Sequence, residues 1–580
     1  MARCRYAWSL AGMLALASAL PASAELPLSL TVTNRLAEAR ASAPVTWGVP
    51  LAPEDAVTDA AQLDLVRDGA AVPVQMTPLV RWGGAPGDAT RPIAWLLMDC
   101  QLDLPASGSA QLQLVRRARA TPASPLQIAR NDASGIVVAT GAATYTLSKT
   151  SFRLFDSVTL AGGATFSGGG GIRYAGALLS GPAEITVEHQ GTERISLLAR
   201  GTVLGDLEYT LRLHFYKNLA EVKAELRLEN FSTYAWREEQ PDCNDYGSQG
   251  SVAFDDVSLV FPGSGARDYR YPTGERGSGA DATGTYATRL ALIQESSGDA
   301  NWNALLSEAP RLQSGAAKRA STLSLDGASS DGPNQIAGWL DSGGVTAAAE
   351  ACWQNFPKAL RATGGAVEVG LFPGEFARDH ELRAGEFKTH TVWIRHHAAS
   401  APDVGSRARS ALAPLRLVAP AEDVADTQAA GLFAPRMFAD FPEYELGVDY
   451  QITESPHYQT YPWQSAAPTV LDSISMAQLY GWVDYGDIPT DFEPVGAGVL
   501  SAPWNLKWDG LRGTIHQALR TDDETWWEMA GAGARHAADI DLLHSRRRGR
   551  TAERQWPDGG MYGHAYHDER GNVNPHRNYD

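Results

Sequence analysis

Long runs of alternating apolar and polar residues constrain the fold of this 580-residue chain more than any other feature. The longest is LEYTLRLHFYKNLAEVKAELRLENF, and ISLLARGTVLG precedes it with the same alternation. Because side chains on a strand point alternately to its two faces, four apolar residues of the longer run share one face: Tyr209, Leu211, Leu213 and Phe215. Strands this long with one polar face predict a large antiparallel β-sandwich.

The chain is too long for one hydrophobic core, so about two to four domains are expected. Its first region contains short strands separated by Gly, Pro and Asp turns, including a hairpin that turns at Asp68-Gly69. This pattern predicts a small β-barrel or sandwich. In the last region the apolar spacing becomes helical. The predicted domains are a β domain over residues 25–118, the sandwich over 119–400 and a helical domain over 425–580.

Residues 1–24 have the organisation of a secretory signal peptide, with Arg3 and Arg5, an apolar run, and a small-residue cleavage site ending at Ala24. We therefore expect a secreted or periplasmic protein. No later segment resembles a transmembrane helix, so a membrane is not an expected partner. The net charge of −18 argues against nucleic acid, but it allows an acidic polysaccharide in a locally basic cleft. The sequence does not indicate an oligomeric state.

Cysteine usage gives no metal-binding motif. Of the 4 cysteines, Cys100, Cys243 and Cys352 remain after cleavage of the signal peptide, and their spacing matches no metal site. One disulfide at most can form among them. Cys100 ends the apolar run IAWLLMDC and is predicted to be a buried free thiol. The sequence identifies no cofactor; a divalent cation such as Ca²⁺ is compatible with the chain, without a motif to place it.

Residues that suit carbohydrate chemistry gather between residues 481 and 580. Six of the 13 histidines lie from His516 to His576, and six tryptophans accompany them from Trp482 to Trp556. Imidazoles transfer protons near neutral pH, and aromatic rings stack on sugars. This stretch therefore predicts a carbohydrate-active site.

Several segments, in order along nearly the whole mature chain, resemble one family. WGVPL, DGAAVPVQ, RW and AWLLMD resemble the N-terminal RIFT-barrel domain of the YetA-like and exo-rhamnogalacturonan lyase proteins. DYGSQGSVAFDDVSL, CWQNFPKAL, VGLFPGEF and LRAGEFKTHTVWI resemble the central β-sandwich of that family. GWVDYGDIPTD, NLKWD, RTDDETWWEMAGAGARHAADID and HRNYD resemble its C-terminal (α/α) toroid.

The resemblance implies a secreted polysaccharide lyase that cleaves a uronic-acid-containing, pectin-like backbone such as rhamnogalacturonan by β-elimination. A complete toroid needs more helix pairs than residues 425–580 supply, because this span holds only about three or four antiparallel pairs. We therefore expect the sequence to be a C-terminally truncated form that lacks part of the toroid and of its cleft.

β-Elimination needs a cation or hydrogen-bond donor on the uronate carboxylate, a base for the C5 proton and support for the leaving oxygen. The glycine-rich segment YGHAYH predicts a loop that carries His564 and Tyr566 as catalytic groups, and Arg577 can bind a carboxylate through two hydrogen bonds. His536 is also a candidate, because Asp539 lies three residues away on the same helix and can orient the imidazole. A structural histidine in an apolar helical stripe is the alternative for His536.

Further side chains are candidates for substrate binding. Trp504 and Trp508, four residues apart, form a stacking platform or pack in the core. Asp484 and Asp487 flank Tyr485-Gly486, where they bind a cation, act as acid and base, or cap helices. The predicted substrate-binding residues are Trp504, Asn505, Trp508, Tyr562 and His576.

Two other functions remain open from the sequence. (α/α) toroids also carry glycoside hydrolases, which need a pair of carboxylates. The available carboxylates are Asp484, Asp487, Asp509 and Asp539. A carbohydrate-binding protein without catalysis is the third alternative, and truncation of the toroid favours it.

Overall fold

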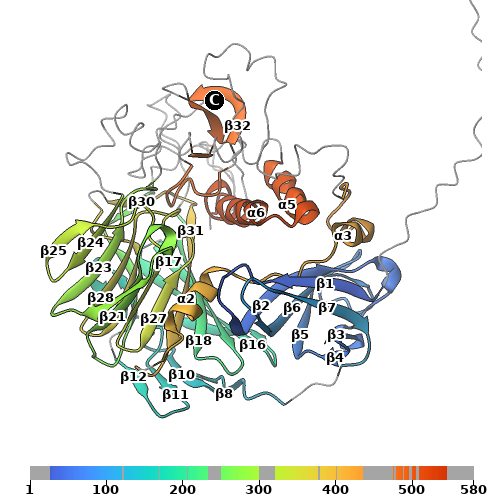
Figure 1. Cartoon of the computed structure of the whole chain (residues 1–580), viewed down its shortest axis with the longest axis horizontal. Coiled ribbons are helices and arrows are strands. Elements are labelled where there is room, and N and C mark those ends of the chain that lie inside the picture. The colour runs from blue at the N-terminus through green and yellow to red at the C-terminus, as the bar shows by residue number, and fades with distance from the viewer. Residues whose placement is uncertain are drawn as a thin grey trace, which may run out of the picture.

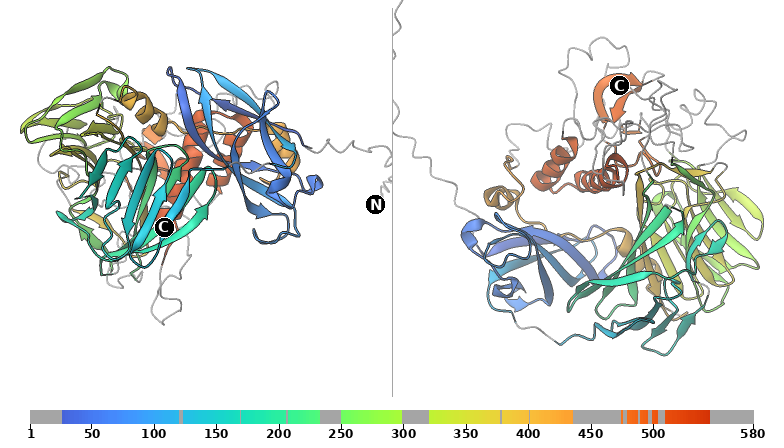
Figure 2. Two further views of the ribbon diagram at one scale, coloured as in Figure 1. Left: turned by 90° about the horizontal axis from the view of Figure 1, so that it is seen from below. Right: turned by 180° about the vertical axis from the view of Figure 1, so that it is seen from behind.

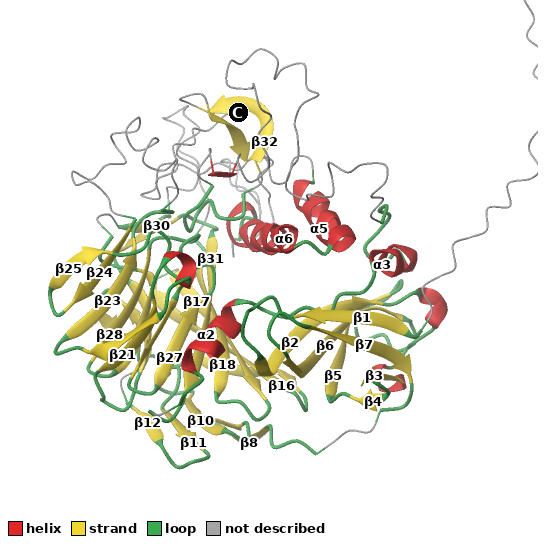
Figure 3. Cartoon of the chain, viewed as in Figure 1, coloured by secondary structure: helices red, strands yellow, loops and turns green. Residues whose placement is uncertain are grey.

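The structure is a computed structural model. It describes residues 26–119, 123–168, 170–205, 207–232, 250–298, 320–376, 379–399, 401–435, 474–475, 479–487, 489–495, 499–503 and 509–544. These residues form several β-sheets and few helices (Figure 3). Two large hydrophobic cores are present, one in the N-terminal β region and one in the sandwich region. The prediction of a β-rich chain is confirmed.

The N-terminal β region, blue in Figure 1, contains two antiparallel sheets. One has the strand order β1-β7-β3-β4 and the other has the order β2-β6-β5. The predicted hairpin is confirmed, because β3 pairs with β4 and both Asp68 and Gly69 have the positive φ that a two-residue turn requires. The strands are β1 (Leu28–Thr33), β2 (Arg40–Pro50), β3 (Leu63–Arg67), β4 (Ala70–Ala71), β5 (Val74–Arg81), β6 (Ile93–Leu104) and β7 (Ser109–Arg116).

A segment from far along the chain completes this first core. Leu415 and Leu417 are buried among the apolar residues of the N-terminal strands. Backbone bridges join Val45 to Leu415 and Thr31 to Val418. The N-terminal β region therefore includes residues that follow the sandwich, a feature that the sequence patterns did not predict.

The sandwich consists of an eight-stranded and a nine-stranded antiparallel sheet that share one core (Figures 1 and 2). The first has the order β14-β13-β20-β29-β28-β23-β24-β25, and the second has the order β15-β16-β17-β18-β31-β27-β26-β21-β22. The strands of the first are β13 (Gly171–Tyr174), β14 (Ala177–Leu178), β20 (Val257–Phe261), β23 (Arg289–Gln294), β24 (Ser321–Leu325), β25 (Ala328–Asp331), β28 (Lys358–Thr363) and β29 (Ala366–Phe372). Those of the second are β15 (Glu184–Gln190), β16 (Arg194–Leu204), β17 (Leu207–Tyr216), β18 (Glu221–Asn230), β21 (Asp268–Pro272), β22 (Asp281–Thr285), β26 (Trp339–Ser342), β27 (Val345–Ala349) and β31 (Phe387–His396).

Smaller sheets complete the β structure. A five-stranded sheet has the order β12-β11-β10-β9-β8, and β19 pairs with β30 and β32 with β33. Their strands are β8 (Gln127–Asn131), β9 (Gly135–Ala139), β10 (Ala143–Ser148), β11 (Ser157–Leu160), β12 (Thr165–Ser167), β19 (Val252–Phe254), β30 (His380–Leu382), β32 (Pro489–Val495) and β33 (Val499–Pro503).

Burial in the sandwich follows the alternation in the sequence. All four residues predicted to share one face of β17 are buried in the core: Tyr209, Leu211, Leu213 and Phe215. Cys100 on β6 is a buried free cysteine, as predicted, and so is Cys352. Cys243 lies outside the described residues.

The helices lie between and above the two β regions (Figure 1). They are α2 (Val404–Leu412), α3 (Ala421–Thr427), α5 (Gly510–Thr521) and α6 (Glu524–His536), with a π-helical turn over Ala537–Asp541 and 3-10 turns over Pro53–Asp55, Ala60–Gln62 and Glu275–Gly277. Helices α5 and α6 pack together through Ala518, Trp526 and Ala530. Among the described residues, no helix combines the length and the apolar character that crossing a bilayer requires.

A buried ion pair joins the two β regions. The guanidinium of Arg194 on β16 donates to both carboxylate oxygens of Asp99 on β6, at 2.7 and 3.1 Å. The side-chain oxygen of Gln75 accepts from the backbone N–H of Glu193 and of Arg194. Since each buried polar group has a partner, this junction holds the N-terminal region and the sandwich in a fixed relation beneath the helices.

Candidate active site

A turn at residues 481–487 is anchored in the end of the sandwich. Trp482 is fully buried and packs edge-on against Phe372, with ring centroids 5.1 Å apart. Its backbone N–H donates to Phe356 O, and that of Gly481 donates to Gln354 O. The anchor holds the rest of the turn, through Asp487, between the sandwich and helix α6.

Gly486 allows this turn to touch helix α6. Its φ is +114°, which L-residues with a side chain rarely adopt. A Cβ there would lie 2.5 Å from Ala532 O and 2.6 Å from the Cβ of His536. Only glycine therefore permits the close approach that brings Asp487 to His536.

Replacing Gly486 by alanine is expected to lower the free energy of unfolding by about 2–4 kcal/mol, because strained backbone and steric overlap act together. Urea denaturation followed by circular dichroism measures the change. The control is Gly513→Ala on α5, where an added Cβ meets nothing within 4 Å. Because alanine has the higher helix propensity, this variant is expected to raise the free energy of unfolding by up to about 1 kcal/mol. Equal stability of Gly486→Ala and wild type would contradict the role assigned to this glycine.

The π-helical turn at the end of α6 brings a second carboxylate to His536. In an α-helix a residue five positions later lies about 140° around the axis. Here the N–H of Leu542 donates to Ala537 O, the i→i+5 bond of a π-turn, and Asp541 returns to the face of His536. The Nε2 atom of His536 lies 3.0 Å from Asp487 Oδ1 and 3.3 Å from Asp541 Oδ1.

These three residues, which we call the triad, are at most 4 % exposed. Burial by itself lowers the pKa of His536, but Asp487 and Asp541 outweigh burial and raise that pKa well above its usual value. In the absence of another cation the imidazole is therefore protonated at neutral pH.

Lys388 and His390 on β31 are buried beside the triad. They lie on the same face of the strand as Val392 and Ile394, which belong to the sandwich core. Burial lowers the pKa of Lys388 to about 8, with the charge of Arg535 acting in the same direction and that of Asp539 opposing it. Burial also lowers the pKa of His390 well below its usual value, so that imidazole is neutral. A lysine with this pKa is partly deprotonated in mildly alkaline solution.

A cavity of about 340 Å³ opens over Lys388 and Tyr485. Strand β31 and helix α6 form two of its walls, and α6 contributes Trp527 and Arg535. The residues that follow α2 form another wall, which includes Arg416. A second cavity of about 190 Å³ shares several of these walls and continues toward β1. The two cavities share walls from Ala413, Pro414, Arg416, Glu524 and Glu528, and we call them together the groove.

Aromatic and cationic groups meet at the wall of this groove, where Trp527 and Arg416 line it. Trp527 and Trp47 pack edge to face with ring centroids 4.9 Å apart. The guanidinium carbon of Arg416 lies 5.8 Å from the centroid of Trp527 and 6.0 Å from that of Trp47. Arg416 also pairs with Glu524 at the start of α6. Arg535, in contrast, is exposed and forms no ion pair with any described residue.

Of the residues predicted to act in catalysis or to bind the substrate of a lyase, His536 is the only one in the described part of the chain; the candidate carboxylates Asp484, Asp487, Asp509 and Asp539 are described as well. The partners of His536 are Asp487 and Asp541, whereas Asp539 accepts hydrogen bonds from the backbone N–H and the hydroxyl of Thr389. The predicted pairing of His536 with Asp539 is therefore wrong. The other predicted catalytic and substrate-binding residues lie outside the described part of the chain: Trp504, Asn505, Trp508, Tyr562, His564, Tyr566, His576 and Arg577.

The two ends of the segment that carries His536 are held by other side chains. At its start Asp523 caps α6 by accepting from the N–H groups of Thr525 and Trp526. After the π-turn, His544 stacks on Phe387 with ring centroids 3.8 Å apart.

The sequence patterns missed Lys388, Tyr485 and Arg535. A signal for Lys388 was present, because the alternation in FKTHTVWIRH places it on the apolar face of its strand. A lysine in such a position is either hydrogen-bonded in the interior or functional. No comparable signal marks Arg535, which is one of several arginines on a helix surface.

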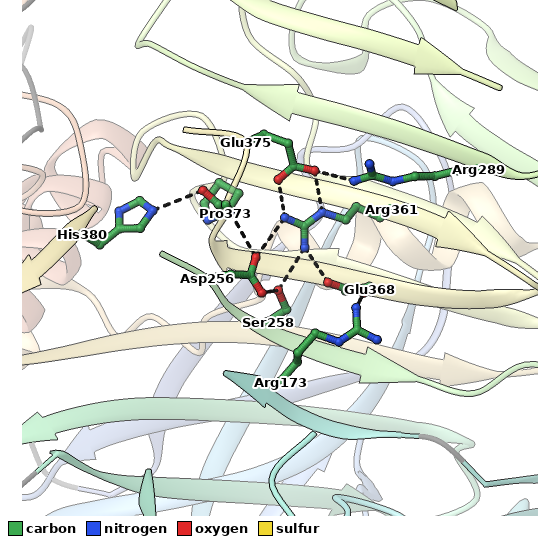
Figure 4. Close-up of polar contacts among 10 residues, drawn as sticks. Arg173, Asp256, Ser258, Arg289, Arg361, Glu368, Pro373, Glu375 and His380 are labelled. Carbon is green, nitrogen blue, oxygen red and sulfur yellow. Dashed lines mark hydrogen bonds and ion pairs between the residues drawn. The ribbon is translucent and has the colours of Figure 1, made fainter. Parts of the chain in front are cut away.

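A second polar cluster lies elsewhere in the sandwich and serves a different purpose. Figure 4 shows Arg361 on β28 surrounded by Glu375, Glu368 and Asp256, with Ser258 as a further acceptor. Burial lowers the pKa of Arg361, and the surrounding carboxylates more than offset this effect. Every face of the guanidinium is occupied, so we assign this cluster to stability and the groove to function.

No family model matches the chain, and no curated protein sequence matches it. Solved structures with some likeness include a glycosyl hydrolase family 38 protein from Enterococcus faecalis, 12% identical with a TM-score of 0.38. The alignment covers 68% of this chain and 47% of that one, so the chain spans about half of its length. A TPR-domain containing protein from Parabacteroides distasonis is 10% identical with a TM-score of 0.28, covering 72% and 70%. A GH36 alpha-galactosidase from Geobacillus stearothermophilus is 15% identical with a TM-score of 0.23, covering 45% and 32%. Likenesses this weak determine neither the fold nor the function.

Proposed function

We propose that this chain is a secreted, carbohydrate-active protein of the YetA-like and exo-rhamnogalacturonan lyase type. Its activity is β-elimination on a uronic-acid-containing, pectin-like polysaccharide. In this proposal the N-terminal β region is a RIFT-type barrel, and α5 and α6 supply one helix pair of an (α/α) toroid. The signal-peptide pattern of residues 1–24 supports export to the periplasm or the exterior.

The observation that carries the proposal is that several of the family-like segments line the same cavity. CWQNFPKAL supplies Gln354 and Asn355 to the cavity, and LRAGEFKTHTVWI supplies Lys388. GWVDYGDIPTD supplies Tyr485, and the α6 segment supplies Trp527, Arg535 and His536. Segments separated by more than a hundred residues thus converge on one cavity, as residues of a shared active site do.

The side chains of the cavity match the needs of β-elimination. The Arg535 guanidinium is available to pair with the uronate carboxylate, which makes the C5 proton more acidic. The neutral amine of Lys388 removes that proton, and the Tyr485 hydroxyl donates a proton to the leaving oxygen. Trp527 offers an apolar face on which a sugar ring can stack.

The pH profile tests Lys388 as the base. Because only the neutral amine accepts a proton and burial lowers its pKa to about 8, we expect kcat/KM to rise with pH through about 8 and then level off. A Lys388→Arg variant, which stays protonated, is expected to lack this rise. Reactions without enzyme at each pH correct for spontaneous elimination. A flat wild-type profile between about pH 7 and 9 would exclude Lys388 as the base.

The reaction products distinguish the proposed activity from its alternatives. Incubation with rhamnogalacturonan and other acidic glycans is expected to produce unsaturated uronides, seen as new ultraviolet absorbance. Saturated reducing ends without this absorbance would indicate a glycoside hydrolase. Binding without either product would indicate a carbohydrate-binding protein.

A further inference from the structure

The triad has the spacing of a metal site. One oxygen of Asp487, one oxygen of Asp541 and one ring nitrogen of His536 all lie within 4.8 Å of one another. Ligands bound to one ion at about 2.0–2.2 Å are about 3.0–3.5 Å apart when they are neighbours in its coordination shell. The two contacts of His536 Nε2, at 3.0 and 3.3 Å, fall in this range.

Two unusual backbone features both serve to assemble these three side chains. Gly486, at a φ of +114°, lets the turn that carries Asp487 touch helix α6 beside His536. The π-turn after His536 brings Asp541 to the same face, which a regular α-helix would not do. Both features are rare and costly, and rare backbone geometry is concentrated at functional sites.

The charges around the triad also favour a cation. Four carboxylates are buried here, those of Asp484, Asp487, Asp539 and Asp541. Lys388 is buried in the same neighbourhood, where the charges of Asp484, Asp487, Asp539 and Arg535 all act on it. The triad itself offers two carboxylate oxygens and one ring nitrogen within 4.8 Å of one another, and these are donor atoms that a divalent ion takes.

We propose that Asp487, His536 and Asp541 bind a divalent transition-metal ion, with Zn²⁺ as the first probe. One imidazole and two carboxylates suit Zn²⁺ or Mn²⁺ better than Ca²⁺, which takes oxygen ligands almost exclusively. Three protein ligands leave at least one coordination position for water or another group. The inference holds whether or not the protein is a lyase, since its test measures metal binding.

The test uses the full chain without an affinity tag, stripped with a chelator, loaded with Zn²⁺ and separated from excess metal by gel filtration. Elemental analysis is expected to find about one Zn²⁺ per wild-type chain. Competition with a chromophoric chelator is expected to show that Asp487→Asn and Asp541→Asn weaken Zn²⁺ binding by at least about 100-fold. Zn²⁺ is expected to raise the Tm of the wild type but not of these variants.

The matched control is Asp539→Asn. Asp539 is a buried carboxylate in the same neighbourhood, but it accepts hydrogen bonds from Thr389 and is not one of the three proposed ligands. The variant is expected to retain about one Zn²⁺ per chain. Equal loss of zinc from this variant and from Asp541→Asn would overturn the assignment to the triad.

Wild-type protein alone provides a second measurement if the variants fail to fold. X-ray absorption of the zinc-loaded chain is expected to show nitrogen and oxygen ligands at about 2.0–2.2 Å, including one imidazole. A wild-type chain that retains neither Zn²⁺ nor Mn²⁺ after gel filtration would overturn the proposal. The triad would then be a protonated imidazole held between two carboxylates.

Discussion

Replacing Lys388 by methionine is expected to reduce the rate of the proposed β-elimination by about 10²–10⁴-fold, the contribution of a positioned base. Methionine has a similar length and no proton acceptor, so it removes the chemistry while filling the space. The rate of ultraviolet absorbance increase on rhamnogalacturonan measures the effect. Activity within about threefold of wild type would exclude Lys388 from catalysis.

The control for this variant is Lys358→Met, because Lys358 is also a buried lysine. Its amine donates to three backbone carbonyl oxygens, those of Asn355, Pro357 and Leu371. Losing this lysine leaves buried acceptors unsatisfied, so we expect a lower Tm with kcat little changed in the folded protein. Lys388→Met and Lys358→Met thus separate a loss of catalysis from a loss of stability.

Replacing Arg361 by methionine is expected to lower the free energy of unfolding by about 3–5 kcal/mol, because three carboxylates would keep their burial but lose their shared cation. These are Asp256, Glu368 and Glu375 (Figure 4). Urea denaturation measures the change. The control is Arg212→Met, since Arg212 pairs with Glu188 at the surface, where such a pair contributes about 0–1 kcal/mol.

The pH dependence of this difference has a definite sign. Burial raises the pKa of Glu375, but Arg361 outweighs burial and lowers that pKa below its usual value. A carboxylate with a lowered pKa stabilises the fold above its unfolded pKa and loses this contribution as the pH falls through the folded value. The stability gap between wild type and Arg361→Met should therefore be full at neutral pH and shrink in acid. A gap that widens in acid would contradict the assignment.

Alternation along strands was predictable because it depends on neighbouring residues only. The period of two that placed Tyr209 and Leu213 on the buried face is a local property of a strand. The same reasoning applied to β31 exposes Lys388 as a polar residue in a core position. Its partners, however, lie in a turn and a helix far along the chain, and sequence spacing does not show which distant residue meets it.

The site itself depends on departures from regular geometry. The spacing of His536 and Asp539 is correct for contact on an ideal α-helix, but the helix ends at His536 and a π-turn follows. Because of this change, Asp541 contacts the imidazole, and Asp539 accepts hydrogen bonds from Thr389 instead. No pattern of residue types distinguishes an α-turn from a π-turn here, because both are compatible with the sequence AADID.

The return of residues 415–424 to the first core has a consequence for biogenesis. Leu415 and Val418 pair with strands that are synthesised hundreds of residues earlier. During synthesis, the N-terminal β region emerges first, yet an apolar strip of its core stays uncovered until the whole sandwich has followed. The first region to be made is therefore among the last to be finished, and its open edge needs protection in the interval.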